Sequence, residues 1–256
     1  MSSILILGES GTGKTRSLTT LPGILAVAEF DPSGERSIRR ELRYIDPGDA
    51  NTIDEMDPPL ADTDAAIFRY LSINTTIGKD FRMDNRWMNY NRMYTLYLLD
   101  MNYLLVNSKT VKNVVCDPLT GLSRVAKGAC FANAGTKGPT FKDWDLFAEK
   151  CLEIIEVSQS VEEKNFIMTA HIQTEKDEIT GAIKETPFAD GKKLPRTIMQ
   201  LFDIVYLAVY KDGEYLWRTR PTEMMQSIRN RLVDQEDVPE YIEQDFGKLL
   251  AIMPKK

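Results

Sequence analysis

The segment ILILGESGTGKT, residues 4–15, contains the pattern that decides the fold. Its first four residues are apolar, which is typical of a short strand buried on both faces of a parallel sheet. The next eight residues match GxxxxGK followed by Ser or Thr at every fixed position, and a helix is expected to begin near Gly13. An apolar strand, a glycine-rich turn and a helix in this order predict a phosphate-binding loop, or P-loop, in an α/β fold.

Each part of this loop has a physical reason to bind a triphosphate. The glycines let successive backbone N–H groups point at phosphate oxygens, and the positive end of the following helix dipole adds to the attraction. Lys14 is expected to bridge the β- and γ-phosphates, and the Thr15 hydroxyl to bind Mg²⁺. The alternative is a glycine-rich turn with an exposed lysine. We therefore predict binding of ATP and Mg²⁺ by Gly8, Glu9, Ser10, Gly11, Thr12, Gly13, Lys14 and Thr15.

The rest of the chain alternates strand and helix patterns, as α/β folds do. The helix after the P-loop has to end before Pro22, and residues 24–30 have the pattern of a second buried strand. The charged stretch 34–44 is interpreted as the solvated face of a helix. Helical patterns also cover residues 62–71, 86–106, 143–158 and 246–253. Further strands are expected at residues 111–117, 165–170, 203–210 and 214–219, the last two joined as a hairpin through residues 211–213.

Composition excludes several classes of protein. Of the 256 residues, 43% are hydrophobic and 27% are charged, which excludes extended disorder. No apolar run approaches the roughly 18 residues of a membrane span, and no secretory signal is apparent. The 3 cysteines have no CxxC spacing, so neither a disulfide frame nor a zinc site is indicated. We expect a cytoplasmic protein, in the host cytoplasm if it is viral, with no membrane partner.

Charge and single-residue counts exclude further chemistry. His171 is the only histidine, which excludes HExxH zinc hydrolysis, and no GxSxG or NKxD motif occurs. The formal net charge of -6 means that contact with nucleic acid requires a local basic patch.

Functional side chains are expected at the carboxyl ends of three predicted strands. Asp117 ends an apolar strand as a Walker B acid does and would bind Mg²⁺ with Thr15; alternatively it caps the turn at residue 118. Glu29 and Asp31 follow the second strand, where a carboxylate can orient or deprotonate the attacking water, although Asp31 can instead form a turn with residues 32–34. His171 closes the strand 165–170, at the edge where ligands bind in open α/β sheets. It is either a sensor of the γ-phosphate or a structural residue.

Five features in chain order are shared with a known family. They are the P-loop, Glu29-Phe30-Asp31, Asp117-Pro118-Leu119-Thr120, Thr169-Ala170-His171, and a late hairpin followed by Arg229-Asn230-Arg231. Together they resemble the RecA-like phage P-loop nucleotide-binding proteins, a group that includes single-strand annealing and recombination ATPases. The resemblance covers residues 1–231, without a matching motif at 46–110. It implies a RecA-like fold, with a mostly parallel twisted sheet flanked by helices.

The same resemblance implies a mechanism and partners. These are ATP hydrolysis in a homo-oligomer, a head-to-tail ring or filament that holds single-stranded DNA, with a single-strand-binding protein as a further candidate partner. Arg229 and Arg231 would reach the γ-phosphate of the neighbouring subunit as arginine fingers, the alternative being ordinary basic surface. The family usually places Asp before Glu after the second strand, whereas Glu29 precedes Asp31 here, so either carboxylate can be the base.

Residues 118–142 are the candidate surface for single-stranded DNA. The segment has no acid, its glycines predict mobility, and Phe131 and Phe141 can stack on bases. In RecA-like folds a DNA-facing loop follows the Walker B strand. The expected DNA contacts are Arg124, Lys127, Lys137 and Lys142.

The sequence therefore predicts a RecA-like ATPase core at residues 1–231, with a helical insertion of undefined role at 46–110. An acidic tail with a short helix is expected at 232–256, and we hypothesise that its acids screen the DNA site from casual contact. The predicted function is ATP binding and hydrolysis in phage-type recombination, strand annealing or replication. The alternatives are a P-loop small-molecule kinase and a nucleotide-bound regulatory or structural subunit with little turnover.

Overall fold

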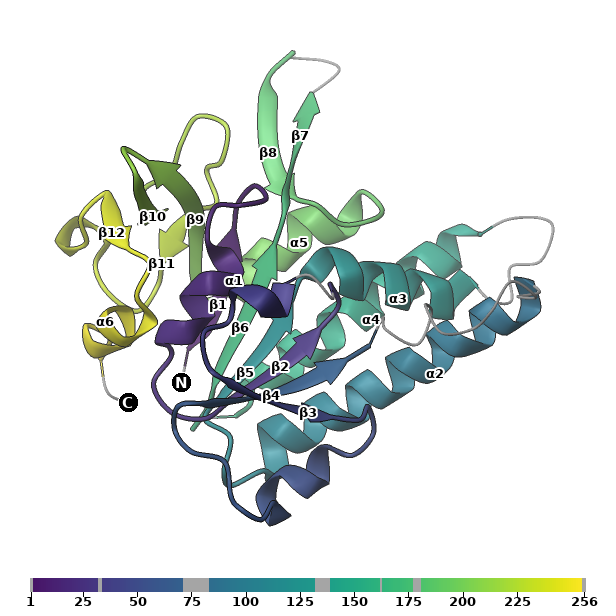
Figure 1. Ribbon diagram of the computed structural model, residues 1–256. Coiled ribbons are helices and arrows are strands. Elements are labelled where there is room, and N and C mark those ends of the chain that lie inside the picture. Colours follow the sequence, from purple (N-terminus) through teal and green to yellow (C-terminus); the bar gives the residue numbers. More distant parts are fainter. Residues whose placement is uncertain are drawn as a thin grey trace.

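The main sheet has ten strands in the part of the chain that the computed structural model describes, residues 2–31, 34–70, 83–131, 139–161, 163–176 and 181–254. Their order is β12-β10-β9-β1-β6-β5-β2-β4-β3, and β11 pairs with β9 (Figure 1). Neighbours from β9 to β3 are parallel, whereas β10, β11 and β12 are antiparallel to their partners. The strands are β1 (Ser3–Leu7), β2 (Leu25–Glu29), β3 (Glu41–Ile45), β4 (Asp64–Arg69), β5 (Asn113–Asp117), β6 (Asn165–Ala170), β9 (Ile204–Lys211), β10 (Glu214–Arg218), β11 (Arg229–Asn230) and β12 (Tyr241–Glu243).

Helices cover both faces of this sheet. At the end of β5, Asp117 contacts Thr15 of α1, while Cys116 lies against Tyr97 of α2. Because successive side chains of a strand point to opposite faces, α1 and α2 lie on opposite sides of the sheet. On the α2 side, α2 packs on α3 and α3 on α4 (Figure 1). The helices are α1 (Lys14–Ser17), α2 (Met83–Asn102), α3 (Leu119–Phe131), α4 (Phe141–Gln159), α5 (Lys193–Leu201) and α6 (Phe246–Ala251).

The predicted α/β class and the late hairpin are confirmed. Strands β9 and β10 pair antiparallel, and Lys211 lies opposite Glu214. The two residues between them, Asp212 and Gly213, have φ angles of 54° and 88°. Two successive positive φ angles form the tight turn whose twist matches that of the flanking strands.

Two segments that were predicted to be helical are strands. Within residues 62–71 the structure has β4, and the stretch 34–44 contains a 3-10 turn (Gly34–Ser37) followed by β3. The apolar residues 65–68 are fully buried because β4 lies between β2 and β3 with both of its faces covered. A short apolar run of this kind has no periodicity that separates strand from helix. Strand β3, with polar exposed positions, is the edge of the sheet.

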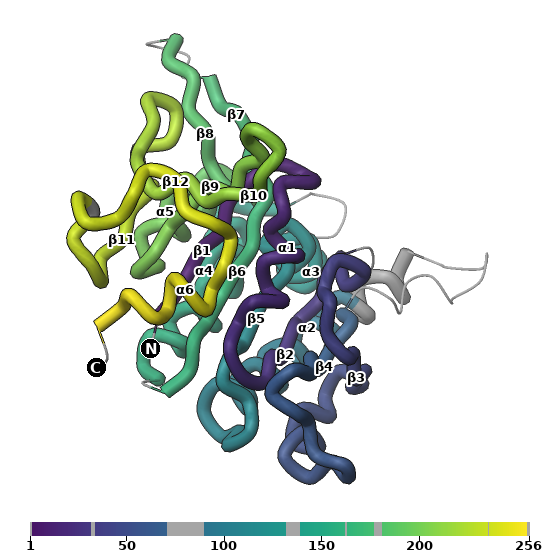
Figure 2. The backbone as a smooth tube through the Cα atoms, turned by 60° about the vertical axis from the view of Figure 1, so that its left-hand side comes forward, coloured from purple at the N-terminus to yellow at the C-terminus, as the bar shows by residue number. Residues whose placement is uncertain are grey.

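A two-stranded arm and the C-terminal segment complete the fold. Strands β7 (Ile172–Lys176) and β8 (Ile183–Pro187) form a hairpin that extends beyond the main sheet in both views (Figures 1 and 2). The short helix predicted at 246–253 is confirmed as α6, and it packs with β12 against the body of the protein. Among the described helices, none combines the length and apolar character needed to cross a membrane.

Gly121 of α3 offers a test of the helix–sheet packing. A Cβ atom at this position would lie 2.2 Å from Phe30 Cβ and 2.8 Å from the Phe30 carbonyl oxygen. Helix propensity alone would make Gly121→Ala stabilising by roughly 1 kcal/mol. Because backbone blocks the new methyl group, we expect instead a loss of about 2 kcal/mol or more in the free energy of unfolding, measured in urea.

The matched control is Gly247→Ala in α6, where the nearest atom would be 3.1 Å away and belongs to the Asp245 side chain. Gly247→Ala should change the free energy of unfolding by no more than about 1 kcal/mol. A Gly121→Ala protein as stable as the parent would show that α3 does not pack on Phe30 in this way.

Candidate functional site

The P-loop leaves the carboxyl end of β1 and returns into α1, as predicted. Gly11 and Gly13 have φ angles of 81° and 89°, which side chains rarely tolerate. Space also restricts residue 13, because a Cβ there would lie 2.5 Å from Gln244 Oε1 and 2.7 Å from Tyr215 Cδ1. Glycine at this position therefore allows the loop to pack closely against the C-terminal part of the sheet.

Lys14 is held inside this loop. Its side chain donates hydrogen bonds to the carbonyl oxygens of Gly8, at 2.8 Å, and Glu9, at 2.6 Å. Burial lowers the pKa of Lys14 to about 8, against the nearby charges of Asp117 and Glu9, which raise it. The ammonium group thus lies where the loop curls, the position that a triphosphate would share.

Asp117 connects the loop to two strands. The Thr15 hydroxyl donates to Asp117 Oδ2 at 2.8 Å, and the Thr169 hydroxyl donates to Asp117 Oδ1. Asp117 is only 5% exposed, and burial raises its pKa, although the two hydroxyl groups and Lys14 act in the opposite direction. The structure therefore brings Thr15 and Asp117, the two residues predicted to bind Mg²⁺, into direct contact.

The surroundings of this pair suit a magnesium ion. A Cβ atom on Gly34 would lie 3.5 Å from Asp117 Oδ2 and 3.8 Å from Thr15 Oγ1, so the glycine leaves space beside both oxygens. Among the described residues, no cluster of three or more His, Cys, Asp or Glu side chains could enclose a metal. One hydroxyl and one carboxylate match Mg²⁺, which keeps several waters and takes substrate phosphates as further ligands.

A cavity of about 450 Å³ opens in front of these residues. Its walls include three residues whose positions were not predicted to be functional, Arg16, Arg36 and Arg39, together with Tyr215. The Arg16 guanidinium lies over the Tyr215 ring, 4.7 Å from its centroid. With Lys14 the three arginines place four cations against the two carboxylates of Asp31 and Asp117, which gives the cavity an excess of positive charge.

The interpretation of residues 34–44 as a solvated helix face is therefore wrong for Arg36 and Arg39. Both follow the carboxyl end of β2, which lies at the same edge of the sheet as the P-loop. That position after a parallel strand was the available signal in the sequence.

His171 and Asp31 also line the cavity. His171 follows the end of β6, and burial lowers its pKa, with the charge of Lys14 acting in the same direction. Its ring is consequently neutral at pH 7 and able to donate or accept a hydrogen bond. The Asp31 carbonyl oxygen also accepts from the Gly34 backbone N–H at 2.9 Å, whereas residues 32 and 33 of the predicted turn lie outside the described residues.

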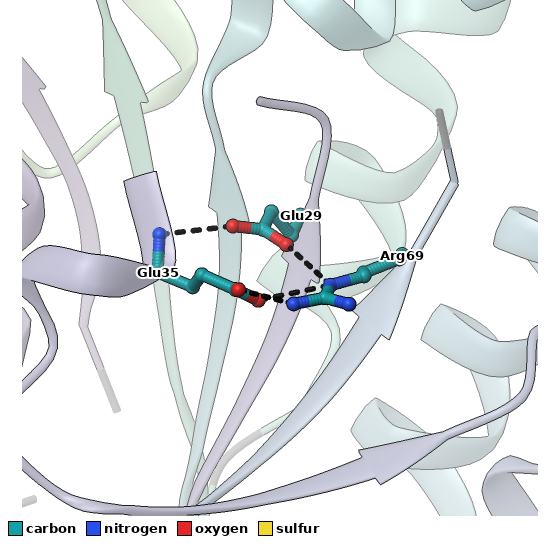
Figure 3. A network of polar contacts seen from close by, with 3 residues as sticks. All are labelled: Glu29, Glu35 and Arg69. Carbon is teal, nitrogen blue, oxygen red and sulfur yellow. Dashed lines mark hydrogen bonds and ion pairs between the residues drawn. The ribbon is translucent and has the colours of Figure 1, made fainter. Parts of the chain in front are cut away.

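Glu29, in contrast, does not line the cavity. Its carboxylate accepts from the Glu35 backbone N–H at 2.9 Å and from Arg69 Nε at 3.3 Å, and Arg69 also binds the Glu35 carboxylate (Figure 3). Two carboxylates thus share one guanidinium. Glu29 is the more buried of the two, at 3% exposed, and burial raises its pKa to about 7. The network anchors the turn that carries Gly34 and Arg36 to β2 and β4.

The predicted DNA-binding residues are only partly placed together. Arg124 and Lys127 lie on α3 and Lys142 on α4, whereas Lys137 lies outside the described residues. Lys127 forms an ion pair with Asp190 at 2.8 Å. The expected mobile loop after β5 is wrong for residues 119–131, which form α3, because its apolar residues pack on the sheet. Phe131 is likewise buried, with its ring centroid 4.8 Å from that of Trp144.

Arg229 and Arg231 lie near the amino ends of the parallel strands, beside the start of β9, whereas the P-loop follows the carboxyl end of β1. Arg229 donates to the carbonyl oxygens of Met199 and Phe202, and Arg231 donates to that of Gln200 at 3.0 Å. These bonds satisfy carbonyl groups at the end of α5. A role toward a neighbouring subunit stays a prediction.

The burial of the Glu29 carboxylate predicts a pH dependence of stability, because it raises the pKa of this group although Arg69 acts in the opposite direction. Because the folded protein holds the Glu29 proton more tightly than an unfolded chain with a pKa of 4.5, the contribution of this group is fully present below pH 4.5. It is lost as the pH rises to about 7. Glu29→Gln should therefore gain about 1 to 3 kcal/mol relative to the parent between pH 5 and pH 8, measured by urea unfolding.

The exposed surface carboxylate Asp145, replaced in Asp145→Asn, is the control and should show a much smaller change over this range. A constant difference between Glu29→Gln and the parent at both pH values would contradict a raised pKa for Glu29.

Three comparisons relate the chain to known proteins. A family model described as "AAA domain" matches residues 2–232. No curated protein matches the sequence. One similar solved structure is described as "a prototypical ATPase from the type III secretion system of pathogenic bacteria", with 12% identity and a TM-score of 0.43. The similarity covers 81% of this chain and 51% of that one, so the chain spans about half the length of that ATPase.

The narrower resemblance to phage annealing and recombination proteins stays a prediction. The family match, in contrast, extends over most of the chain and includes the P-loop, Asp117 and His171. The chain therefore belongs to the AAA domain family and has a P-loop ATPase domain.

Proposed function

We propose that this protein binds Mg·ATP in the cavity in front of the P-loop and hydrolyses it. The observation that carries the proposal is the contact of Thr15 and Asp117 beside Lys14, in a cavity that is also lined by three arginines. A triphosphate supplies the negative charge that this cavity lacks. The proposal places the nucleotide-binding core at residues 1–231, in which β3 and β4 extend the sheet.

The residues divide into binding and chemical roles. Backbone N–H groups of the P-loop and the Lys14 ammonium would bind the β- and γ-phosphates, while Arg36 and Arg39 neutralise further charge. Thr15 and Asp117 would hold Mg²⁺, which neutralises charge that develops on the phosphate oxygens. The neutral His171 would donate a hydrogen bond to the γ-phosphate. Little covalent work is left to the protein, because phosphoryl transfer depends mainly on positioning and charge.

Asp31 is the better candidate for the group that orients or deprotonates the attacking water. It faces the cavity, whereas Glu29 is enclosed by Arg69 and Glu35 away from it. A base must come within hydrogen-bond distance of the water it activates. We therefore propose Asp31 as the base and an anchoring role for Glu29.

Single-stranded DNA is a second candidate ligand, and one observation favours it. Phe141, the first residue of α4, is 92% exposed and lines an apolar cavity of about 370 Å³ with Trp144. Lys192 and Lys193 line the same cavity, and Lys142 is exposed next to Phe141. Asp145 and Asp190 line it too, and Lys193 forms an ion pair with Asp145 at 3.0 Å. An exposed aromatic ring near lysines, here that of Phe141, is a feature on which a single strand can stack. A head-to-tail homo-oligomer belongs to this part of the proposal, with Arg229 and Arg231 as its arginine fingers.

The assignment of the base predicts different outcomes for two carboxylates. Asp31→Asn should lower kcat for ATP hydrolysis by about 10²-fold or more, because the water loses its base, with a smaller change in the Kd for Mg·ATP. Glu29→Gln should lower kcat by less than about tenfold, since it does not touch the water. Both are measured by phosphate release and by calorimetric titration.

Lys14→Ala is the reference variant for this experiment, and it should weaken Mg·ATP binding by roughly 10²-fold through loss of a charge-assisted contact. The assignment of the base is wrong if Glu29→Gln abolishes turnover while Asp31→Asn retains it.

The two alternative functions have their own tests. Fast phosphoryl transfer from ATP to a nucleoside or metabolite would favour a small-molecule kinase. If the function of the protein persists in the Lys14→Ala variant, a regulatory or structural subunit with little turnover is favoured.

The DNA proposal is tested on Phe141. Phe141→Ala should weaken binding of a fluorescent single-stranded oligonucleotide by roughly tenfold, as expected for loss of one stacked base, and affinity should fall with salt. Ile252→Ala, which removes an exposed apolar residue near the C-terminus, is the control and should bind as the parent does. Absence of oligonucleotide binding by the parent at low ionic strength would end this part of the proposal.

A further inference from the structure

The P-loop makes a side-chain contact with the far end of the chain. Gln244, directly after β12, donates from its Nε2 to the Thr12 carbonyl oxygen at 2.8 Å and to the Leu216 carbonyl oxygen at 3.0 Å. The Gln244 side chain is buried, at 8% exposed. The residue lies outside the family match, which ends at residue 232.

Both hydrogens of the Gln244 amide group are therefore used to connect the P-loop to β10. The position of Gln244 is itself fixed, because β12 pairs with β10 and the Gln244 backbone N–H donates to the Tyr215 carbonyl oxygen at 3.3 Å. The Gln244 Oε1 and the Tyr215 ring close over the Cα of Gly13, where no side chain fits. One residue of the C-terminal segment thus fixes the two residues that precede Lys14.

A second contact lies at the other end of the P-loop helix. The backbone N–H of Phe246 donates to the Thr20 hydroxyl at 2.8 Å, and Thr20 ends the 3-10 turn that continues α1. In Figure 1 the yellow helix α6 accordingly lies near the purple N-terminal part of the chain, while β12 is the outer strand beyond β10. Residues 241–246 therefore contact the loop–helix unit both before and after Lys14 and Thr15.

The Thr12 contact has a consequence for anion binding. The Thr12 carbonyl and the Gly13 N–H belong to one planar trans peptide, so they point in opposite directions. Because the Thr12 carbonyl points at Gln244, the Gly13 N–H points to the other side of the peptide. Gly13 lines the cavity in front of the P-loop, so this N–H is available to a phosphate there. A rotated peptide would present the carbonyl oxygen instead, which repels phosphate.

We propose that Gln244 is a positioning residue of the nucleotide site, which fixes the Thr12–Gly13 peptide of the P-loop in the orientation that binds phosphate. Nucleotide affinity then depends on residues 232–256, the segment that the sequence analysis interprets as an acidic tail. This inference rests on the proposed binding of Mg·ATP.

The test compares two Gln244 variants with the parent in calorimetric titrations with Mg·ATP. Gln244→Met keeps the length of the side chain and removes both donated hydrogen bonds. Gln244→Glu keeps the shape but places a carboxylate beside two carbonyl oxygens. We expect the Kd for Mg·ATP to rise about tenfold in Gln244→Met, because the buried hydrogen bond to the Thr12 carbonyl is lost. In Gln244→Glu the Kd should rise at least as much. KM should rise with Kd, while kcat at saturating ATP changes by less than about threefold.

Met253→Ala is the matched control, because Met253 packs in the same segment and accepts from Ser2 without touching the P-loop. It should lower the melting temperature but leave Kd unchanged. The inference is overturned if Gln244→Met binds Mg·ATP within about twofold of the parent, or if Met253→Ala weakens binding equally at an equal loss of melting temperature.

Two further results, a Gln244→Met protein that does not fold and a parent that does not bind Mg·ATP, are distinguished as follows. If Gln244→Met does not fold, Gln244→Asn, whose shorter amide does not reach Thr12, replaces it with the same expected and contrary results. If the parent itself binds no Mg·ATP, the proposed function is wrong, whereas binding by the parent and by Gln244→Met alike overturns only the role of Gln244.

Discussion

The buried carboxylate of Asp117 is the group on which the candidate site depends. It accepts hydrogen bonds from Thr15 of the P-loop helix and from Thr169 of β6, so one side chain joins α1 to two strands of the sheet. A buried carboxylate is costly unless it is hydrogen-bonded or paired, and these two hydroxyl groups with the nearby Lys14 provide that compensation. Since Thr15 follows Lys14 directly, the same contact fixes the position of the lysine. The site is thus organised by the sheet, with β1 next to β6 and β6 next to β5.

Much of the fold and the centre of the site could be predicted because their signals are local. The P-loop, the strand before it, the acid that ends β5 and the histidine that follows β6 are each readable within a few residues. Strand β4 could not be distinguished from a helix, because four consecutive buried apolar residues fit both. The charge pattern of residues 34–44 favours a solvated helix face, which conceals that Arg36 and Arg39 follow β2 at the edge of the sheet where the P-loop lies. Gln244 was missed for a stronger reason, because its partner Thr12 is 232 residues away.

The two acids after β2 show how packing separates residues that the sequence leaves equivalent. Asp31 remains at the cavity, whereas Glu29, two residues earlier, turns to Arg69 and Glu35 (Figure 3). Its buried ion pair supports the turn that carries Gly34 and Arg36, so Glu29 shapes the cavity without facing it. On the other side of the P-loop, Gln244 and Tyr215 close over Gly13. The loop is therefore supported from both directions by residues that belong to no nucleotide-binding motif.

The central claim is that the cavity at the P-loop takes a magnesium nucleotide. Calorimetric titration of the full-length parent protein with ATP, in the presence of Mg²⁺ and again with the metal chelated, tests it most directly. We expect heat of binding with one nucleotide per chain, and weaker binding once Mg²⁺ is removed, because Thr15 and Asp117 would hold an ion that neutralises phosphate charge. No heat with Mg·ATP, from protein shown to be folded by its circular dichroism, would contradict it.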